Sequence, residues 1–351
     1  MTSFQPDYHH IVDAASNKEA ARLPLYEHVV GGKALEAAAG RSFWHLSEQE
    51  GGLPAFYDGY CQAFNNMGYD TVSFECCIGG ALVSGGALGG HVKGVIQTRE
   101  DFERYPWEDI PKRYFEFFAP HFASLRNAMP EGMSAIGGVG NGVFELAQDL
   151  VGYMDLCVMR YEDPGLYADL FQRIGDMMAA IWHKFIAEFG DIFCVLRFGD
   201  DLGFKTNSLI SREDIIQYVI PQYKRLVDLA HGAGKKLLLH SCGNIFNVMD
   251  DIISIAHIDA KHSNEDVIAP FNVWVERYGD RIGNFGGIDT DVLCRETPEE
   301  IREYVLDSLR RAQGHGGIAF GSGNSIPDYV PTGGYLAMIE TVRDWRGDRA
   351  I

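Results

Sequence analysis

His240 and Cys242 have the residue types and the spacing of a metal-binding pair. They follow a short apolar run, 236–239, and alternate residues of an extended segment point to the same side. Imidazole and thiolate are both ligands that zinc binds in proteins. The pair therefore predicts a zinc site at His240 and Cys242.

A structural role for these two residues is the alternative. His240 would then hydrogen-bond to a neighbouring strand end, and Cys242 would be a small buried thiol. Two ligands do not complete a zinc site, which needs at least one more protein ligand. The candidates at other strand ends are Glu75, Cys76, Asp200 and Asp201.

Asp200 and Asp201 are consecutive carboxylates between Gly199 and Gly203. At a strand end, one of two consecutive side chains points into the mouth of the fold and the other points sideways. A carboxylate in a dry mouth serves as a general base, a metal ligand or a stabiliser of a cation, whereas the alternative role is to cap the following turn. We predict catalytic roles for Asp200, Asp201 and His240.

Such strand-end residues need a fold that brings strand ends together. Short apolar runs alternate with longer segments of helical periodicity along the whole chain. The runs at 23–30, 71–75, 133–138, 192–198, 236–239, 256–261, 282–287 and 317–320 predict eight strands. We therefore predict one (β/α)8 barrel, or TIM barrel, over residues 1–351, with residues 1 to about 20 as an N-terminal extension.

Further sequence signals refine this prediction. Asp163, Ser211 and Thr297 are capping residues that predict helix starts. The segments 31–70 and 78–130 exceed an ordinary connection and predict extended early loops. The runner-up fold is an open doubly wound sheet, but the glycine-rich run at 137–140 lacks the acidic partner of a dinucleotide fingerprint.

The active site of a barrel lies at the carboxyl ends of its strands. Polar residues at these ends are our candidates for substrate binding: Tyr26, His28, Glu75, Asn141, Asp289 and Ser322. Tyr26 and four phenylalanines near the same ends are candidates for an apolar wall: Phe74, Phe198, Phe204 and Phe246. His91 and His262 are interpreted as loop residues.

The charge balance restricts the partners. The 30 Lys and Arg residues against 49 Asp and Glu residues give a formal charge of −19, which disfavours nucleic acid, anionic lipid and polyanionic substrates. Seven cysteines are few for a chain of this length, and their number is odd, which argues against a disulfide scaffold. We therefore expect a reducing, cytoplasmic setting. No apolar stretch approaches the ~20 residues of a membrane span.

Several stretches together resemble the uroporphyrinogen decarboxylase superfamily. They are FGDDLG at 198–203, YVIPQY at 218–223, HSCG at 240–243, GGIDT at 286–290, GSGNSI at 321–326 and YLAMI at 335–339. The resemblance covers roughly residues 20–345. It implies a (β/α)8 barrel and one of two chemistries: decarboxylation of a tetrapyrrole, or methyl transfer to or from a corrinoid with a zinc ion.

The residues favour methyl transfer over decarboxylation. A porphyrinogen with eight carboxylates needs a cluster of arginines, and the decarboxylases resemble one another in an arginine-rich segment after the first strand. This chain has EHVVGGK at 27–33 and no arginine from there until Arg41. A strongly acidic chain without these donors is a poor host for a polyanion.

The resemblance to the zinc methyltransferases includes His240 and Cys242, which match two of the three zinc ligands of the coenzyme M methyltransferases. Ser322 stands where those enzymes have the third ligand, a cysteine. A site of His240 with acidic ligands is harder and suits an ether oxygen or an amine. We therefore expect a corrinoid-dependent demethylase that takes a methyl group from a small donor, with a methoxylated aromatic favoured, and passes it to a corrinoid protein. A relative that only binds a small molecule is the third reading.

Overall fold

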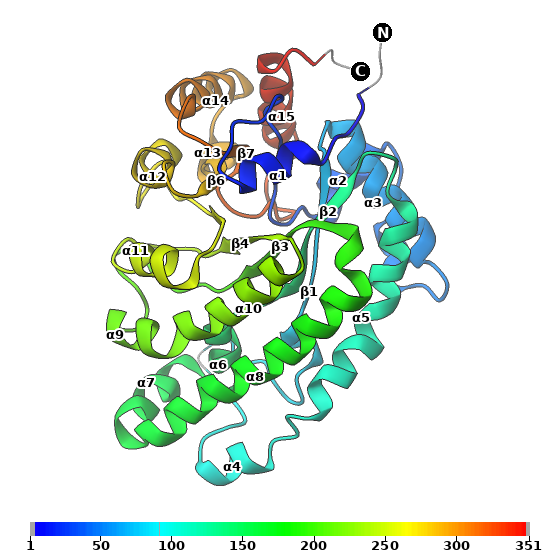
Figure 1. Ribbon diagram of the computed structural model, residues 1–351. Helices are drawn as coiled ribbons and strands as arrows, with labels where there is room; N and C mark the ends of the chain where they lie inside the picture. The colour runs from blue at the N-terminus through cyan, green and yellow to red at the C-terminus, as the bar shows by residue number, and fades with distance from the viewer. Residues whose placement is uncertain (1–3, 91, 349–351) are drawn as a thin grey trace.

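A computed structural model describes residues 4–90 and 92–348 of the chain, and Figure 1 shows the arrangement of the elements. Its sheet has seven parallel strands, and each strand pairs with the next one along the chain. The strands are β1 (Thr71–Cys77), β2 (Ser134–Gly140), β3 (Phe193–Gly199), β4 (Lys236–His240), β5 (Ala260–His262), β6 (Gly283–Ile288) and β7 (Ile318–Ser322). This sequential parallel order confirms the α/β class, because repeated strand–helix units produce it.

The predicted closed barrel of eight strands is not observed, because the first predicted strand does not form. Residues 23–30 form no regular strand but lie beside β7, where Leu25 makes an isolated parallel bridge to Phe320. Pro24 contributes to this outcome, because proline has no N–H group to donate to a ladder. The Pro24 carbonyl still accepts a hydrogen bond from the Phe320 N–H at 2.9 Å.

The other side of residues 23–30 faces β1. The two are joined by a side-chain hydrogen bond, in which Ser73 Oγ donates to the His28 carbonyl at 2.7 Å. We call this join between residues 25–30 and β1 the seam. At the seam, side chains rather than a backbone ladder complete the wall of the fold.

Helices occupy the connections. They are α1 (His9–Ala15), α2 (Gly32–Ala39), α3 (Leu53–Met67), α4 (Arg99–Arg104), α5 (Asp109–Ala128), α6 (Val143–Val151), α7 (Tyr153–Glu162), α8 (Pro164–Phe189), α9 (Arg212–Asp214), α10 (Ile220–Gly232), α11 (Met249–Asp251), α12 (Phe271–Tyr278), α13 (Thr290–Arg295), α14 (Pro298–Ala312) and α15 (Thr332–Trp345). Shorter helical segments are η1 (Trp44–Glu48), η2 (Ile78–Ala81), η3 (Gly190–Ile192), η4 (Ile215–Val219) and η5 (Ile252–Ala256). Figure 1 shows α5, α8 and α10 side by side along one face of the sheet.

The predicted helix starts are confirmed. The side chains of Asp163, Ser211 and Thr297 each accept a hydrogen bond from a backbone N–H in the first turn of the helix that follows. The long early segments hold η1, α2, α3, α4 and α5. The predicted strand 256–261 is shifted to β5 because η5 continues to Ala256.

The N-terminal segment covers the amino ends of the strands. Ile11, Ala14 and Ala15 of α1 are buried in one cluster with inward-facing strand residues such as Leu238 and Ala260. The apolar filling of this end leaves the opposite, carboxyl end of the strands for polar side chains.

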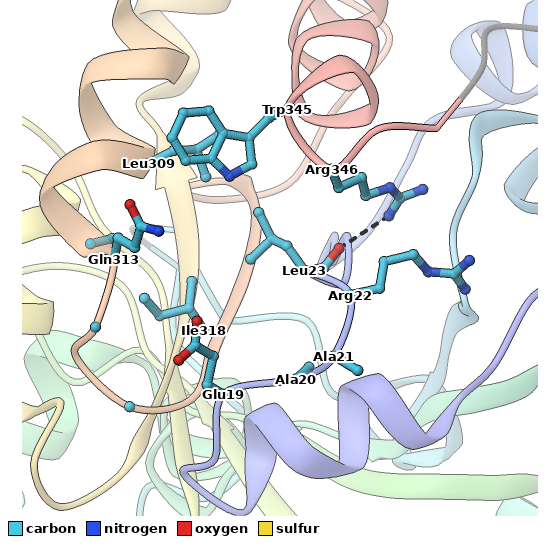
Figure 2. Close-up of a pocket in the computed structure, with 13 residues that line it drawn as sticks. Glu19, Ala20, Ala21, Arg22, Leu23, Leu309, Gln313, Ile318, Trp345 and Arg346 are labelled. Carbon is cyan, nitrogen blue, oxygen red and sulfur yellow. Dashed lines mark hydrogen bonds between the residues drawn. The ribbon is translucent and has the colours of Figure 1, made fainter.

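A cavity of about 310 Å³ lies beside this amino end, and Figure 2 shows it. Leu23, Leu309, Ile318 and Trp345 line it. The Arg346 side chain at its edge is engaged, since it donates to the Leu23 carbonyl at 3.2 Å. The polar strand ends do not line this cavity, so we place the candidate site elsewhere. Among the described residues, no helix is long and apolar enough to cross a membrane.

Residues 25–30, which we call the seam segment, pack on β7, and this packing can be tested at Gly321. A Cβ atom there would lie 1.7 Å from the Tyr26 carbonyl oxygen. We expect Gly321→Ala to lower the free energy of unfolding by about 2–3 kcal/mol, because the backbone must shift. The measurement is urea unfolding followed by circular dichroism. Gly333→Ala, where nothing lies within 4 Å, is the control and should cost nothing; a fully stable Gly321→Ala protein would contradict the packing described.

Candidate functional site

Polar side chains gather at the carboxyl edge of the sheet. Asp200 and Asp289 directly follow β3 and β6, and His240 and Ser322 are the last residues of β4 and β7. Parallel strands present their carboxyl ends at the same edge. The four residues therefore share one end of the fold, although their side chains face different partners.

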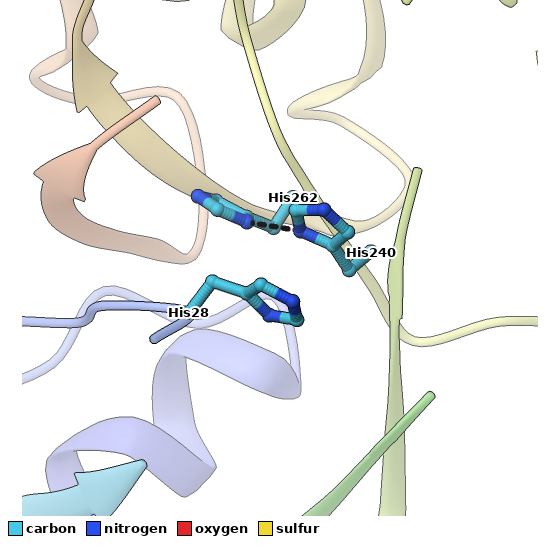
Figure 3. Close-up of side chains that lie close together, drawn as sticks. All are labelled: His28, His240 and His262. Carbon is cyan, nitrogen blue, oxygen red and sulfur yellow. Dashed lines mark hydrogen bonds between the residues drawn. The ribbon is translucent and has the colours of Figure 1, made fainter. Parts of the chain in front are cut away.

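Three histidines lie in contact at this edge (Figure 3). The rings of His28 and His240 stack, with centroids 3.7 Å apart and planes 8° apart. His240 Nδ1 lies 2.7 Å from His262 Nδ1, and His262 Nε2 lies 3.0 Å from the Ser322 carbonyl oxygen. Burial lowers the pKa of all three imidazoles, and that of His262 to about 3. Each ring is therefore neutral at physiological pH and carries one proton.

Because each ring carries one proton, the donor and the acceptor of each hydrogen bond from His240 through His262 to Ser322 can be assigned. A carbonyl oxygen only accepts, so His262 donates from Nε2 to Ser322 and keeps a lone pair on Nδ1. His240 must then donate from Nδ1 to His262. The lone pair of His240 is consequently on Nε2, the nitrogen that lies 3.3 Å from Cys242 Sγ and 3.8 Å from Asp201 Oδ1.

Asp201, His240 and Cys242 form a group whose ligand atoms all lie within 4.8 Å of one another. With Zn–N and Zn–S bonds of about 2.0–2.3 Å, tetrahedral ligands stand roughly 3.3–3.6 Å apart, close to the separations found here. The Cys242 N–H donates to Asp201 Oδ1 at 2.8 Å, which holds the carboxylate over the thiol. The Asp201 side chain remains 45% exposed, so the group is accessible from the mouth. The donor atoms of these three residues fit a zinc ion, with Asp201 as the candidate for an acidic third ligand.

The three histidines are a second group of potential ligands. Their closest nitrogens are 2.7 Å apart, which is the length of a hydrogen bond and shorter than the roughly 3.3 Å between two tetrahedral zinc ligands. We therefore assign His262 to the support of His240. A histidine ligand held through its other nitrogen is the usual arrangement at metal sites.

Ser322 directs its hydroxyl to the seam segment. Its Oγ is hydrogen-bonded to Glu27 Oε2 and lies 2.7 Å from the Asn324 carbonyl oxygen. One hydroxyl proton serves only one of these oxygens, so the other bond requires a proton on Glu27. Burial raises the pKa of Glu27 to about 8, in agreement with a protonated acid. The Ser322 hydroxyl is therefore engaged in hydrogen bonds and does not belong to the group of Asp201, His240 and Cys242.

The two consecutive aspartates face different directions. Asp200 is fully buried and accepts hydrogen bonds from the N–H groups of Phe144 and Glu145, at 3.1 and 2.8 Å, at the start of α6. The Tyr223 hydroxyl donates to it at 2.7 Å. Asp200 therefore holds α6 against β3, whereas Asp201 faces the metal-ligand group.

Glu145 and Asn141 lie beside these carboxylates. Asn141 Nδ2 donates to one oxygen of Glu145 at 2.9 Å, and the Asp201 N–H donates to the other at 3.3 Å. Burial, together with the negative charges of Asp200 and Asp201, raises the pKa of Glu145 to about 8. Burial also raises the pKa of Asp200, to about 7. Glu145 and Asp200 are thus two carboxyl groups next to Asp201 whose protonation is favoured near neutral pH.

Arg197 is fully buried in the centre of the fold. Its guanidinium donates two hydrogen bonds to Glu75 Oε2, at 2.8 and 3.1 Å, and further bonds to the Tyr26 hydroxyl and to Ser73 Oγ. Tyr26 and Glu75, two predicted substrate-binding residues, are therefore partners of Arg197. The other oxygen, Glu75 Oε1, lies 3.9 Å from Cys77 Sγ, which donates to it, and 3.9 Å from His28 Nε2.

A cavity of about 250 Å³ opens at the seam beside these groups. Polar residues at one end of its lining are His28, Ser73, Glu75 and Arg197. Aromatic residues of its walls are Trp44, Phe56, Tyr57, Tyr60 and Phe74. This cavity, and not the one at the amino end, joins an apolar space to the candidate site.

The remaining predicted residues lie away from the cavity. Asp289 accepts from the Asp291 N–H at 2.7 Å and caps α13. Of the predicted wall residues, Phe74 lines the cavity, whereas Phe198 packs on Tyr223, Phe246 stacks on Trp274 and Phe204 is exposed.

Sequence reasoning misplaced or missed several residues. The interpretation of His262 as a loop residue was wrong, because it ends β5 and is buried; His91 lies outside the described residues. Lys261 was also missed: its Nζ lies 3.5 Å from the centre of the Trp274 ring, and burial lowers its pKa to about 7. The run KH after a short apolar segment was the available signal.

Comparisons with known proteins agree with this architecture. The family model described as uroporphyrinogen decarboxylase (URO-D) matches residues 60–345. A methyltransferase from Methanosarcina mazei is 15% identical, with a TM-score of 0.70 over 96% of this chain and 98% of that chain. A Listeria monocytogenes protein assigned as a vitamin-B12-independent methionine synthase is 11% identical, with a TM-score of 0.53 over 93% and 98% of the two chains. No curated protein sequence matches the chain.

The metal-ligand assignment predicts the effect of three substitutions on bound zinc. His240→Ala and Cys242→Ala should each reduce the content from about one zinc per chain to below about one tenth, because two ligands do not hold the ion. Ser322→Ala is the matched control and should retain zinc, since its hydroxyl faces Glu27. Elemental analysis after dialysis measures this; zinc retained by His240→Ala, or lost from Ser322→Ala, would refute the ligand set.

Proposed function

The chain belongs to the uroporphyrinogen decarboxylase (URO-D) family, and from this membership we propose that it is a methyltransferase that moves a methyl group from a small donor to a corrinoid carried by a partner protein. A methoxylated aromatic is the favoured donor. The observation that carries the proposal is the group of Asp201, His240 and Cys242 at the mouth of the fold. The likeness to the Methanosarcina methyltransferase supports it at the level of the fold.

Methyl transfer from an ether needs help at the leaving oxygen. The O–CH3 bond breaks, the methyl group passes to the reduced corrinoid, and the oxygen keeps the electron pair of the bond and takes up a proton. When bound, a zinc ion supplies a Lewis acid for that oxygen, and the partner's corrinoid supplies the nucleophile.

The protein's own residues contribute position and protons. The hydrogen bond to His262 holds the His240 ring with its Nε2 lone pair toward Asp201 and Cys242. Glu145, with its pKa raised to about 8, donates the proton that the leaving oxygen requires. Asp201, which lies beside Glu145, orients the methyl donor. Asp200 acts indirectly, because it fixes the start of α6 and with it Glu145.

Tetrapyrrole decarboxylation is the second candidate, since the family is named for it. A substrate with many carboxylates needs free basic side chains. The basic residues next to the candidate site are Arg197, which is paired with Glu75, and Lys261, which is buried against Trp274. This arrangement favours a neutral or cationic small substrate.

The first test of the proposal is a methyl-transfer assay. The protein is mixed with its reduced corrinoid partner and a panel of methoxyaromatics and methylamines, and the visible spectrum of the corrinoid is followed. We expect a change with methoxyaromatics and a loss of ~10²-fold or more in Asp201→Asn. Asp307→Asn on the exposed face of α14 is the control and should behave as wild type. Absence of a spectral change with every donor would move the assignment to a non-catalytic binding protein.

The second test concerns the tetrapyrrole. Anaerobic incubation with uroporphyrinogen should give no decarboxylated product, because the site offers no free arginine cluster. Chromatography of the oxidised porphyrins measures this, and a product with fewer carboxylates would establish the decarboxylase instead.

A further inference from the structure

The side-chain amide of Asn324 is directed at the sulfur of Cys242. Asn324 Nδ2 lies 3.2 Å from Cys242 Sγ, and an amide nitrogen only donates hydrogen bonds. The Ser325 N–H fixes which amide atom is which, because it lies 2.8 Å from Asn324 Oδ1 and needs an acceptor there. The sulfur of Cys242 is therefore the acceptor of an N–H···S hydrogen bond.

The turn that carries Asn324 is tied to residues at the ends of β5, β6 and β7. The Gly323 N–H donates to the Ile288 carbonyl at 2.7 Å, and the Asn264 N–H donates to the Gly323 carbonyl at 2.9 Å. The Asn324 carbonyl accepts from the Ser322 hydroxyl at 2.7 Å. Because the backbone of this turn is already held, the amide meets the sulfur at little further cost in conformational entropy.

Two other polar groups near the sulfur do not take this role. Ser263 Oγ lies 3.7 Å from Cys242 Sγ but 3.3 Å from the Ser241 carbonyl oxygen, and its single proton serves the nearer and stronger acceptor. His240 Nε2, at 3.3 Å, carries a lone pair and accepts from the thiol proton. Metal binding removes that proton, whereas the hydrogen bond from Asn324 uses a sulfur lone pair and is compatible with the thiolate.

A hydrogen bond to a metal-bound thiolate has a chemical consequence. The N–H group draws electron density from the sulfur, so the sulfur donates less to the metal and the metal stays a stronger Lewis acid. A carboxylate as the third ligand acts in the same direction, since it is harder than a thiolate. Asn324 and Asp201 would thus both favour activation of an oxygen atom.

We propose that Asn324 is a positioning residue of the metal-ligand group, which holds Cys242 Sγ toward His240 and Asp201 and reduces electron donation from this sulfur to a bound metal. The inference rests on the function proposed above, in which a metal held by these three residues serves as a Lewis acid. It extends that function to a residue that supplies no ligand atom.

Cobalt(II) titration of the full chain tests the proposal, because a cobalt–thiolate bond gives a charge-transfer absorption band in the near ultraviolet. Asn324→Leu keeps the approximate size of the side chain and removes the N–H donor. We expect its band at longer wavelength than in the wild type, since the sulfur gives up electron density more readily, and a cobalt affinity about tenfold lower. A role limited to packing would lower the affinity without moving the band, so an unshifted band would overturn the proposal.

A second variant and a control complete the test. Asn324→Asp keeps the acceptor for the Ser325 N–H and removes only the donor, so its band should move in the same direction. Asn272→Leu is the matched control, because its amide donates to Glu276 on α12 at 3.2 Å, and it should leave band and affinity unchanged. Circular dichroism checks the fold of each variant, and Asn324→Asp decides the question if the leucine variant is unfolded. A wild-type protein without a cobalt–thiolate band would also overturn the proposal.

The cobalt titration and the methyl-transfer assay fail independently, because the titration needs neither a methyl donor nor a corrinoid. A shifted band without methyl transfer from any donor would retain the role of Asn324 and remove the proposed reaction. Methyl transfer with an unshifted band would retain the reaction and remove the role of Asn324.

Discussion

The guanidinium of Arg197 is the interaction on which the site depends. It comes from β3 and bonds Glu75 and Ser73 of β1 and the Tyr26 hydroxyl of the seam segment, so it ties together both sides of the seam where the backbone ladder is missing. A fully buried cation must be paired, because an unpaired one would cost far more than a hydrogen bond returns. The pairing occupies one oxygen of Glu75 and leaves the other toward His28. Arg197 therefore ties the seam together and fixes Glu75 in the lining of the cavity.

A second constraint reaches the metal-ligand group from the opposite side. The Ser322 carbonyl at the end of β7 sets the proton of His262 on β5, which sets the proton of His240 on β4. The ends of β4, β5 and β7 thus determine the position of one lone pair. This series of hydrogen bonds requires that both imidazole rings are neutral. Burial at the carboxyl edge keeps His240 and His262 neutral by lowering their pKa values. The same dry environment that makes an ionised group costly thus keeps the imidazole neutral, which is the form in which histidine can bind a metal.

Sequence reasoning reached the features that local patterns determine. Polar residues after apolar runs located the carboxyl edge, and the capping side chain of Thr297 located a helix start. It failed where the outcome depends on a contact between distant segments. Residues 23–30 have the composition of a strand, but their pairing depends on Pro24 and on side chains of β1. The cavity was missed because its walls come from η1, α3 and β1, and no pattern within one of these segments shows that they converge.

Ser322 shows how one residue alters the chemistry of the whole edge. Its hydroxyl is bound to Glu27 and to the Asn324 carbonyl and does not join His240 and Cys242. Asp201, two residues after the end of β3, lies 3.8 Å from His240 Nε2 and is the candidate third ligand. Replacing a soft thiolate with a hard carboxylate leaves the net charge of the ligands unchanged but makes a bound zinc ion a stronger Lewis acid toward oxygen. The group is therefore suited to an oxygen leaving group rather than to a thiol.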